Sequence, residues 1–372
     1  MHRTGPCVRC GHRGQRALMG ESMSTSTRKP ARLAEVAKLA GVSPGLVSRI
    51  INDDPTLRVR PETRASVEAA IEMLNYTPHP SARALRNART GLLGFALNDV
   101  NDPIYAEMVE RAQVEAAQQN FSLILLNTAE LAQRGEAFRE IVLGRRVDGL
   151  LIQSGLAPWE DAIQELARAV PSVVFGADPM PGTRTVRLDD ARAAEIATRH
   201  LIDAGHTSIA YMGATGSSSE RRFEGYRDTL VGAGLPWLPA IGGGWTADES
   251  HEATVRFLGS GAQVTAIVAV TTTAALGVHS GIVATGRRIP DDVALVSIND
   301  AWFTRHLNPP LTAVWLPMGD LGALAVHEVI GQIAEPRDGE TVLTEPSPRL
   351  VVRNSTRSLA TGRKDDDPGQ QT

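Results

Sequence analysis

A cysteine and histidine cluster near the N-terminus is the first segment with residue types that could do chemistry. Cys7-x-x-Cys10-x-His12 has the spacing of half a zinc site, but a tetrahedral site needs four ligands. His2 is the one further candidate nearby, so we favour an unstructured leader without metal. The chain has no other cysteines, which excludes a disulfide scaffold and fits the reducing cytosol.

A second segment, residues 41–45, reads Gly-Val-Ser-Pro-Gly and satisfies the G-x-S-x-G pattern of a hydrolase nucleophile elbow. That elbow requires an apolar strand before the serine, because a sharp strand-to-helix turn exposes the hydroxyl. Here a helical pattern precedes Ser43, and Pro44 follows it. Ser43 is therefore predicted to be a helix N-cap, not a nucleophile.

The glycine- and serine-rich residues 213–219 form a third candidate, a phosphate-binding loop. The Gly-Lys-Ser/Thr that would complete a nucleoside triphosphate site is absent, so we expect this loop to form one lip of a binding cleft. The sequence shows no metal cluster, catalytic-triad spacing or dinucleotide fingerprint. We therefore predict a binding protein and not an enzyme.

Composition favours a soluble protein with a basic head. Of the 372 residues, 42% are apolar and 22% charged, and no run approaches a membrane span. No apolar signal-peptide core follows the basic N-terminus, so a cytoplasmic location is expected. Residues 28–90 hold eleven Lys/Arg against six Asp/Glu, whereas residues 91–372 hold 23 against 35. This asymmetry predicts that the head meets a polyanion and the body does not.

The elements that carry these residues begin with a helical pattern at Leu33, which is interrupted at residues 41–43. Eight helical residues, a tight turn and a second short helix predict a helix-turn-helix unit. The second helix is expected to begin with Ser43 as N-cap and Pro44 at its first position. A third helix is expected to begin at Pro61.

The body alternates short apolar runs with amphipathic helical stretches. This alternation predicts an α/β core with parallel sheets and helices on both faces, large enough for two lobes with a cleft between them. Ligands bind beyond the carboxyl ends of the strands in such sheets. The predicted strands are Leu92–Leu97, Ser122–Leu126, Gly149–Gln153, Ser172–Phe175, Ile209–Met212, Ala266–Val270 and Ala294–Ile298, and the clearest helices are Tyr105–Gln118, Ala191–Ala204 and Glu220–Val231.

Several motifs, in order along about 325 residues, resemble the LacI/GalR family of bacterial transcriptional regulators. The resemblance is carried by residues 34–52, Arg60–Arg64, Leu74–Pro78, Ala82–Leu85, Gly94–Pro103, Arg146–Gly149, His200–His206, Arg222–Tyr226, Ile289–Val293 and Pro309–Thr312. It implies a helix-turn-helix head on a two-lobed core like that of periplasmic binding proteins. It also implies a homodimer that binds palindromic operator DNA, most simply as a repressor, under the control of a small sugar-like effector.

The resemblance implies a DNA-binding surface from which this chain departs at two positions. The recognition helix begins with Pro44 and Gly45, which cannot form side-chain hydrogen bonds, so base reading should depend more on Arg49. Leu85 stands where relatives wedge a leucine into the minor groove, with core packing as its alternative. The full predicted set is Arg32, Ser43, Pro44, Gly45, Ser48, Arg49, Asn52, Arg60, Thr63, Tyr76, Ala82 and Leu85. Arg32 replaces a helix-capping threonine, so that cap should be lost.

The resemblance also implies an effector cleft. Its predicted lining residues are Asn98, Asp99, Tyr105, Ser218, Arg222, Trp245, Thr271 and Asn299. Arg222 offers a five-donor fork, with a surface ion pair to Glu220 or Asp228 as the alternative. Trp245 could stack on a sugar face, with a place in the core as the alternative.

Two cleft positions depart from the family pattern. Relatives often carry Asn-Asp where this chain has Thr271-Thr272, and Asp where it has Asn299. An amide donates as well as accepts, which argues against a plain neutral hexose. A modified sugar, a sugar acid or another small polar metabolite suits these residues equally well.

The sequence thus divides into five segments: a disordered leader (1–30), a helix-turn-helix domain (31–76), a hinge linker (77–91), an effector-binding and dimerisation core (92–355) and a disordered tail (356–372). The tail has no leucine heptad to build a tetramer, so a dimer is expected. A solute-binding protein of the same core fold is the alternative, but it would lack the helix-turn-helix and carry a signal peptide.

Overall fold

The computed structural model describes residues 31–52, 54, 56–76, 89–128, 140, 142, 144, 146–155 and 160–359. The chain forms two compact units, residues 1–82 and 83–372. The Cys7 and His12 cluster, the predicted leader, residues 77–88 of the linker and the tail beyond residue 359 lie outside the described residues.

The first unit, called the head, is a bundle of α1 (Leu33–Ala40), α2 (Pro44–Ile51) and α3 (Pro61–Met73). Val36, Val47 and Val67, one from each helix, are fully buried at its centre. Gly41 ends α1 with φ +69, a left-handed conformation that turns the chain into α2. The predicted helix-turn-helix and third helix are confirmed.

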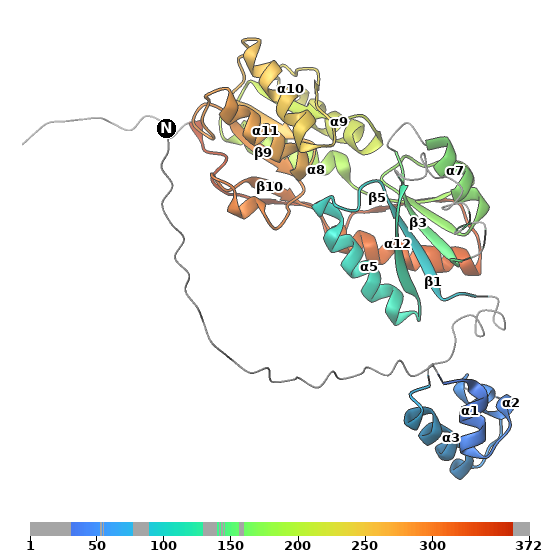
Figure 1. The fold of residues 1–372 in the computed structure, drawn as a ribbon. Coiled ribbons are helices and arrows are strands. Elements are labelled where there is room, and N and C mark those ends of the chain that lie inside the picture. Colours follow the sequence, from blue (N-terminus) through green and yellow to red (C-terminus); the bar gives the residue numbers. More distant parts are fainter. Residues whose placement is uncertain are drawn as a thin grey trace, which may run out of the picture. The chain divides into compact units, whose positions relative to one another are not determined.

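The second unit, called the core, has two lobes, each built on a six-stranded sheet (Figure 1). Lobe 1 has strand order β11-β5-β4-β3-β1-β2. It contains β1 (Leu92–Leu97), η1 (Pro103–Tyr105), α5 (Ala106–Gln118), β2 (Ser122–Asn127), β3 (Gly149–Gln153), α7 (Glu160–Ala169), β4 (Ser172–Phe175), β5 (Arg184–Leu188), α12 (Met318–Ala334) and β11 (Gly339–Leu343).

Lobe 2 has strand order β12-β10-β9-β8-β6-β7. It contains α8 (Asp190–Asp203), β6 (Ile209–Gly213), α9 (Ser217–Gly232), β7 (Ile241–Gly242), α10 (Ala247–Gly259), β8 (Ala266–Ala269), α11 (Thr272–Ala284), β9 (Ala294–Ile298), η3 (Thr304–His306), β10 (Thr312–Trp315) and β12 (Arg349–Val351). Its strands pair in parallel except β10 with β12. The two-lobed α/β core with parallel sheets is as predicted.

Helices cover both faces of each sheet, because successive strand residues point to opposite faces. In β3, Leu151 packs with α5 and α12, whereas Leu150 and Ile152 pack with α7. In β6, Tyr211 packs with α8 and α9, whereas Met212 packs with α10 and α11. These strands are buried on both sides, which explains why they appear in the sequence as continuous apolar runs.

The chain crosses between the lobes at three places. It passes from β5 to α8 at residues 188–190, from β10 to α12 at 315–318, and from β11 to β12 at 343–349. The helix α12 therefore returns to pack on the sheet of lobe 1 beside α5. Three adjacent crossings make a hinge on which the lobes can change their separation.

The structure corrects one predicted boundary and contains strands that were not predicted. The core extends to Leu359 and not to residue 355: Thr356 is buried and bonded to His200, and the Leu359 N–H donates to the Ala204 carbonyl at 2.8 Å. In addition, the predicted strands omitted five that the structure contains, β5, β7, β10, β11 and β12.

Candidate DNA-binding and ligand-binding sites

The N-terminal end of α2 is presented to solvent. Ser43 Oγ accepts the Leu46 N–H at 3.2 Å, and Pro44 occupies the first helical position. This N-cap follows a helix and no strand, so the hydrolase-elbow pattern is a coincidence of sequence. Pro44 and Gly45 are exposed, and Ser48, Arg49 and Asn52 follow at helical spacing on the side opposite the buried Val47 and Ile50.

Arg49, the predicted base-reading residue, is oriented by the loop that follows α2. Its Nε donates to Asp54 Oδ2 at 2.7 Å, and Nη2 donates to Thr56 Oγ1 at 3.1 Å. The hydrogen bonds from Thr56 and Arg49 lower the pKa of Asp54 to about 2, so its carboxylate stays ionised at neutral pH. Because Nε and Nη2 are bonded to Asp54 and Thr56, the Nη1 group of Arg49 is directed away from these two residues.

The other predicted DNA contacts occupy three settings. Arg32 and Arg60 are exposed at the N-caps of α1 and α3, and neither side chain forms a cap. The Arg32 N–H donates to the Glu35 carboxylate at 2.8 Å, which is one half of a capping box. This bond partly replaces the threonine cap that the sequence lacks. Thr63 is half-buried in the first turn of α3, and Tyr76 packs partly against the head core. Ala82 and Leu85 lie outside the described residues.

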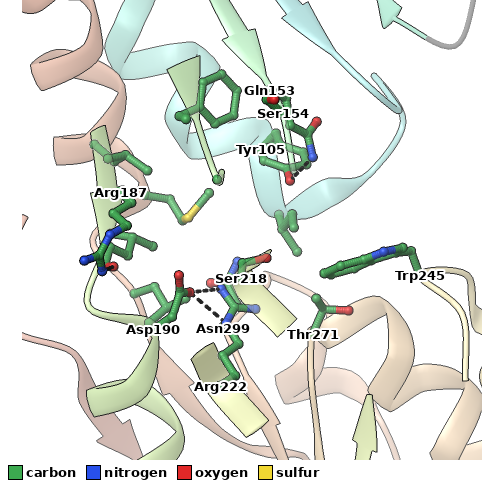
Figure 2. Close-up of a pocket in the computed structure, with 17 residues that line it drawn as sticks. Tyr105, Gln153, Ser154, Arg187, Asp190, Ser218, Arg222, Trp245, Thr271 and Asn299 are labelled. Carbon is green, nitrogen blue, oxygen red and sulfur yellow. Dashed lines mark hydrogen bonds and ion pairs between the residues drawn. The ribbon is translucent and has the colours of Figure 1, made fainter. Parts of the chain in front are cut away.

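A pocket lies between the two lobes at the carboxyl ends of their strands (Figure 2). Six of the eight predicted effector residues line it: Tyr105, Ser218, Arg222, Trp245, Thr271 and Asn299. Asn98 and Asp99 do not, which corrects those two predictions. The Asn98 N–H donates to Gln153 Oε1 at 2.9 Å, and exposed Asp99 accepts the Asn101 N–H at 2.8 Å. These two residues shape the loop after β1.

Arg222 is buried in the floor of the pocket and is held by Asp190. Both Nε and Nη2 lie against Asp190 Oδ1, at 2.9 and 2.8 Å, and Nη1 donates to the Val270 carbonyl at 2.7 Å. The alternative pairing with Glu220 or Asp228 is therefore wrong. Arg222 lies on α9, and Asp190 is the first residue of α8, so the pair fixes the guanidinium between the two helices.

Arg221, the residue before, links the two lobes. Its Nε and Nη2 donate to Asp190 Oδ2 at 3.2 and 2.8 Å. It also pairs with Asp178, and Nη2 donates to the Gly176 carbonyl at 3.1 Å. Gly176 and Asp178 follow β4 in lobe 1, whereas Arg221 is on α9 of lobe 2. One arginine thus binds both lobes.

A second bond between the lobes joins Asp102 and Thr273. The Thr273 hydroxyl, on α11, donates to Asp102 Oδ1 at 3.0 Å. Asp102 also accepts the Ile104 N–H at 3.2 Å and so caps η1. Burial raises the pKa of Asp102. The described lobes are therefore in contact around the pocket.

Asn299 has a conformation suited to its place at the end of β9. Its φ is +72, a left-handed value that asparagine tolerates better than most residues. Its Oδ1 accepts the Asp300 N–H at 2.8 Å, and its carbonyl accepts the Thr272 hydroxyl at 2.8 Å. Thr271 caps α11 by accepting the Ala274 N–H at 3.1 Å. The threonine pair thus shapes the loop that carries Asn299.

Tyr105 and Gln153 form the polar part of the wall from lobe 1. Gln153 Nε2 donates to the Tyr105 hydroxyl oxygen at 2.6 Å. Burial raises the pKa of Tyr105, so the phenol is neutral at physiological pH. Its ring packs edge-on against Phe175, with centroids 6.3 Å apart, which fixes the hydroxyl.

Trp245 lines one side of the pocket, and its partly buried side chain also packs against the core cluster. Its indole N–H donates to the Thr215 carbonyl at 2.9 Å, which sets the plane of the ring (Figure 2). Thr215 belongs to the loop of residues 213–219, and Ser218 at the start of α9 also lines the pocket. The loop thus borders the pocket through Ser218, and its role as a lip of the binding cleft stays a prediction. The remaining apolar lining consists of Ile104, Phe175, Leu188, Leu316, Met318 and Leu321.

Sequence reasoning missed several lining residues, of which Gln153, Ser154, Arg187 and Asp190 are polar. The strand-end rule could have found some of them. Gln153 and Leu188 end β3 and β5, and Asp190 begins the helix after β5. Arg187 had no sequence signal, because its partner Glu340 is on β11, far along the chain.

Two features are absent from the residues that the structure describes. Among them there is no group of three or more His, Cys, Asp or Glu residues placed to hold a metal ion. Within the same residues, no helix is both long and apolar enough to cross a membrane.

Comparisons with known proteins agree with this geometry. Residues 32–79 match the family described as bacterial regulatory proteins, lacI family, and residues 198–356 match the periplasmic binding protein-like domain. The transcriptional regulator GalR of Escherichia coli is 31% identical over 331 residues, which are 87% of this chain and 95% of GalR. The ribose operon repressor of E. coli is 32% identical over 332 residues, which are 87% of this chain and 99% of the repressor.

A solved structure shows the same fold. The crystal structure of the lac repressor dimer bound to operator and an anti-inducer superimposes with a TM-score of 0.76 at 24% sequence identity, covering 88% of this chain and all of that one. The head with its exposed α2 and the two-lobed core with its pocket thus share the fold of that protein. The chain belongs to the LacI family of DNA-binding transcriptional regulators.

Proposed function

We propose that this protein is a transcriptional repressor whose affinity for operator DNA is set by a small polar effector, a sugar or sugar derivative, bound in the pocket. The observation that carries this proposal is the lining of the pocket by both lobes and by the segments that cross between them. A ligand that contacts Tyr105 in lobe 1 and Arg222 in lobe 2 favours one separation of the lobes. It thereby shifts the population of conformations that bind DNA.

The head supplies DNA binding, and we propose that it acts in a homodimer on a palindromic operator, in the cytoplasm. The exposed stripe from Pro44 to Asn52 has the form of a recognition helix that reads bases from its N-terminal half. The lac repressor, which shares this fold, was solved as a dimer bound to operator. A dimer places two such helices one helical turn of DNA apart, which is why its operators are palindromic.

We further propose that the effector is bound and not transformed. Among the described lining residues, the charged side chains and Gln153 are held in pairs: Arg222 with Asp190, Arg187 with Glu340, and Gln153 with Tyr105. Such pairing orients a ligand, whereas nucleophilic catalysis needs a nucleophile beside a base.

The test is a fluorescence-anisotropy titration of the purified full-length protein on labelled DNA from its own upstream region, against scrambled DNA at the same salt concentration. We expect about 1000-fold preference for a palindromic site. Adding sugars and sugar derivatives should then change the operator affinity for at least one of them. Equal affinity for both DNAs, or an operator affinity that no bound ligand changes, would contradict the proposal.

A further inference from the structure

The hydrogen bonds around the pocket specify the chemistry of the ligand. Two side-chain amides line it, and a backbone N–H fixes the orientation of each. Because a backbone N–H can only donate, Gln153 must direct Oε1 toward Asn98, and Asn299 must direct Oδ1 toward Asp300. The Nδ2 group of Asn299 is therefore directed elsewhere, as a donor.

The same logic applies to Tyr105. With Oε1 of Gln153 turned to Asn98, its Nε2 donates to the Tyr105 oxygen at 2.6 Å. The Tyr105 oxygen is thus an acceptor in that bond, and its own O–H remains as a donor. Lobe 1 therefore presents a hydroxyl donor to the pocket.

Asp190, the carboxylate that lines the pocket, is already saturated. A carboxylate accepts about four hydrogen bonds, and Asp190 has four contacts: two from Arg222 on Oδ1 and two from Arg221 on Oδ2. Of the five N–H bonds of Arg222, three are directed at Asp190 and Val270. Two donors of Arg222 remain, beside those of Asn299 and Tyr105.

The charges around the pocket, like its free donors, favour a ligand that carries acceptors and negative charge. Arg221 and Arg222 share one buried carboxylate, and the second partner of Arg221, Asp178, has a side chain that is 58% exposed. Arg187 is matched one to one by Glu340. A buried excess of positive charge is costly unless an anion accompanies it.

We propose that the effector is an organic carboxylate with further oxygen acceptors, such as a sugar acid. This inference rests on the proposed function of the pocket as the effector site. The carboxylate binds the remaining N–H groups of Arg222 and the Asn299 amide, and another oxygen accepts from Tyr105 across the pocket. The face of Trp245 covers the apolar side of the ligand. The carboxylate of Asp190 and the side-chain carbonyl oxygens of Gln153 and Asn299 already accept hydrogen bonds, so a ligand gains more from bringing acceptors than from bringing donors.

The test compares matched pairs of ligands by isothermal titration calorimetry on the full-length protein. The acids are gluconate, galactonate, glucuronate and galacturonate, the neutral partners are glucose and galactose, and glucose 6-phosphate tests a phosphate anion. We expect at least one acid to bind and its neutral partner to bind at least ten times more weakly. The inference is overturned if the protein binds a neutral sugar or glucose 6-phosphate more tightly than the acids. It is also overturned if none of the four acids binds.

The variant Asn299→Asp sharpens the test. Aspartate has the same size and keeps the acceptor for the Asp300 N–H, but it replaces the donor with a negative charge. It should weaken binding of the acid about tenfold or more. Asn120→Asp is the matched control, because Asn120 is also left-handed, with φ +61, and is exposed outside the pocket. Equal effects of the two variants would contradict the assignment.

Operator binding measured on the same samples separates the two proposals. If neutral sugars bind and change operator affinity, the carboxylate inference fails while the repressor function stands. If the protein binds no operator, the proposed function fails, whatever the pocket binds.

Discussion

Arg49 and Asp54 form an ion pair inside the head, with Nε and Oδ2 2.7 Å apart. The pair orients the guanidinium whose remaining N–H groups are proposed to read a guanine. Arg49→Ala should therefore cost about 1–3 kcal/mol of operator binding and much less on scrambled DNA. Fluorescence anisotropy on both DNAs measures this difference. Arg58→Ala, which removes an exposed cation of the same head, is the control, and an equal loss on both DNAs for Arg49→Ala would refute the reading role.

Asp54 should act as a positioning residue for Arg49. Asp54→Asn removes a negative charge near the DNA surface and loosens the arginine, so binding to scrambled DNA should strengthen while operator binding does not. The ratio of the two affinities should fall severalfold. The readout is anisotropy at two salt concentrations, with Glu68→Gln on the exposed side of α3 as the matched loss of charge. A higher ratio would mean that Asp54 competes with the operator for Arg49.

Arg221 should contribute more to stability than an ordinary surface arginine, because it holds buried Asp190 and the Gly176 carbonyl of the other lobe. Arg221→Ala should lower the free energy of unfolding of the core by about 3 kcal/mol. Arg227→Ala is the control on the same helix, since its exposed pair with Asp228 is worth less than about 1 kcal/mol. Urea denaturation of both variants measures the two losses in free energy of unfolding. Similar losses would show that the contact of Arg221 with lobe 1 does not stabilise the core.

Asp102 predicts a pH dependence. Burial raises the pKa of Asp102, so the folded protein binds this proton more tightly than the unfolded chain does. Its contribution to stability is complete below the pKa of the unfolded chain and is lost as the pH rises through the raised pKa. Asp102→Asn, which cannot ionise, should therefore gain in melting temperature relative to the parent protein as the pH rises from 4 toward 7. Differential scanning fluorimetry measures the difference, and a gap that shrinks with pH would reverse the sign we assign.

The strands that form one uninterrupted apolar run could be predicted from the sequence. Strands β1, β3 and β4 are short, apolar and buried on both faces, so each appears as one apolar run; β2 is apolar but only partly buried. Strand β5 was missed because Arg184 and Arg187 interrupt its run. Their charges are matched by Glu328 on α12 and Glu340 on β11, partners that only the folded chain brings near.

The residues of the pocket likewise include some that could be predicted from the sequence and some that could not. Arg222 and Asn299 could be named because each belongs to a local motif or a strand end. The strand-end rule could have placed Asp190 near the pocket but not its role, since that role comes from two arginines about thirty residues later in the chain. Asn98 and Asp99 were placed wrongly because a strand end alone does not tell which way the next loop turns. They bond within and beside that loop instead.

The glycine in Arg222-x-x-Gly-Tyr226 is required for packing between two helices. A Cβ on Gly225 would lie 2.2 Å from the Ala191 carbonyl oxygen, so α8 and α9 approach through this residue. One turn of the helix thus carries the pocket arginine, the close helix contact, and Tyr226, whose hydroxyl donates to the Ile209 carbonyl at 2.8 Å. A larger residue at 225 must separate α9 from α8 and so displace Arg222 from Asp190.

Gly225→Ala should therefore destabilise the core by about 1–3 kcal/mol and weaken ligand binding. Gly232→Ala, at the last residue of the same helix and with nothing within 4 Å of the added methyl, should instead stabilise it by about 0.5–1 kcal/mol. Thermal denaturation of the two variants gives the sign of each change. If both alanines stabilise the protein, the helices do not depend on this contact, and the position of Arg222 must be set by Asp190 and Val270 alone.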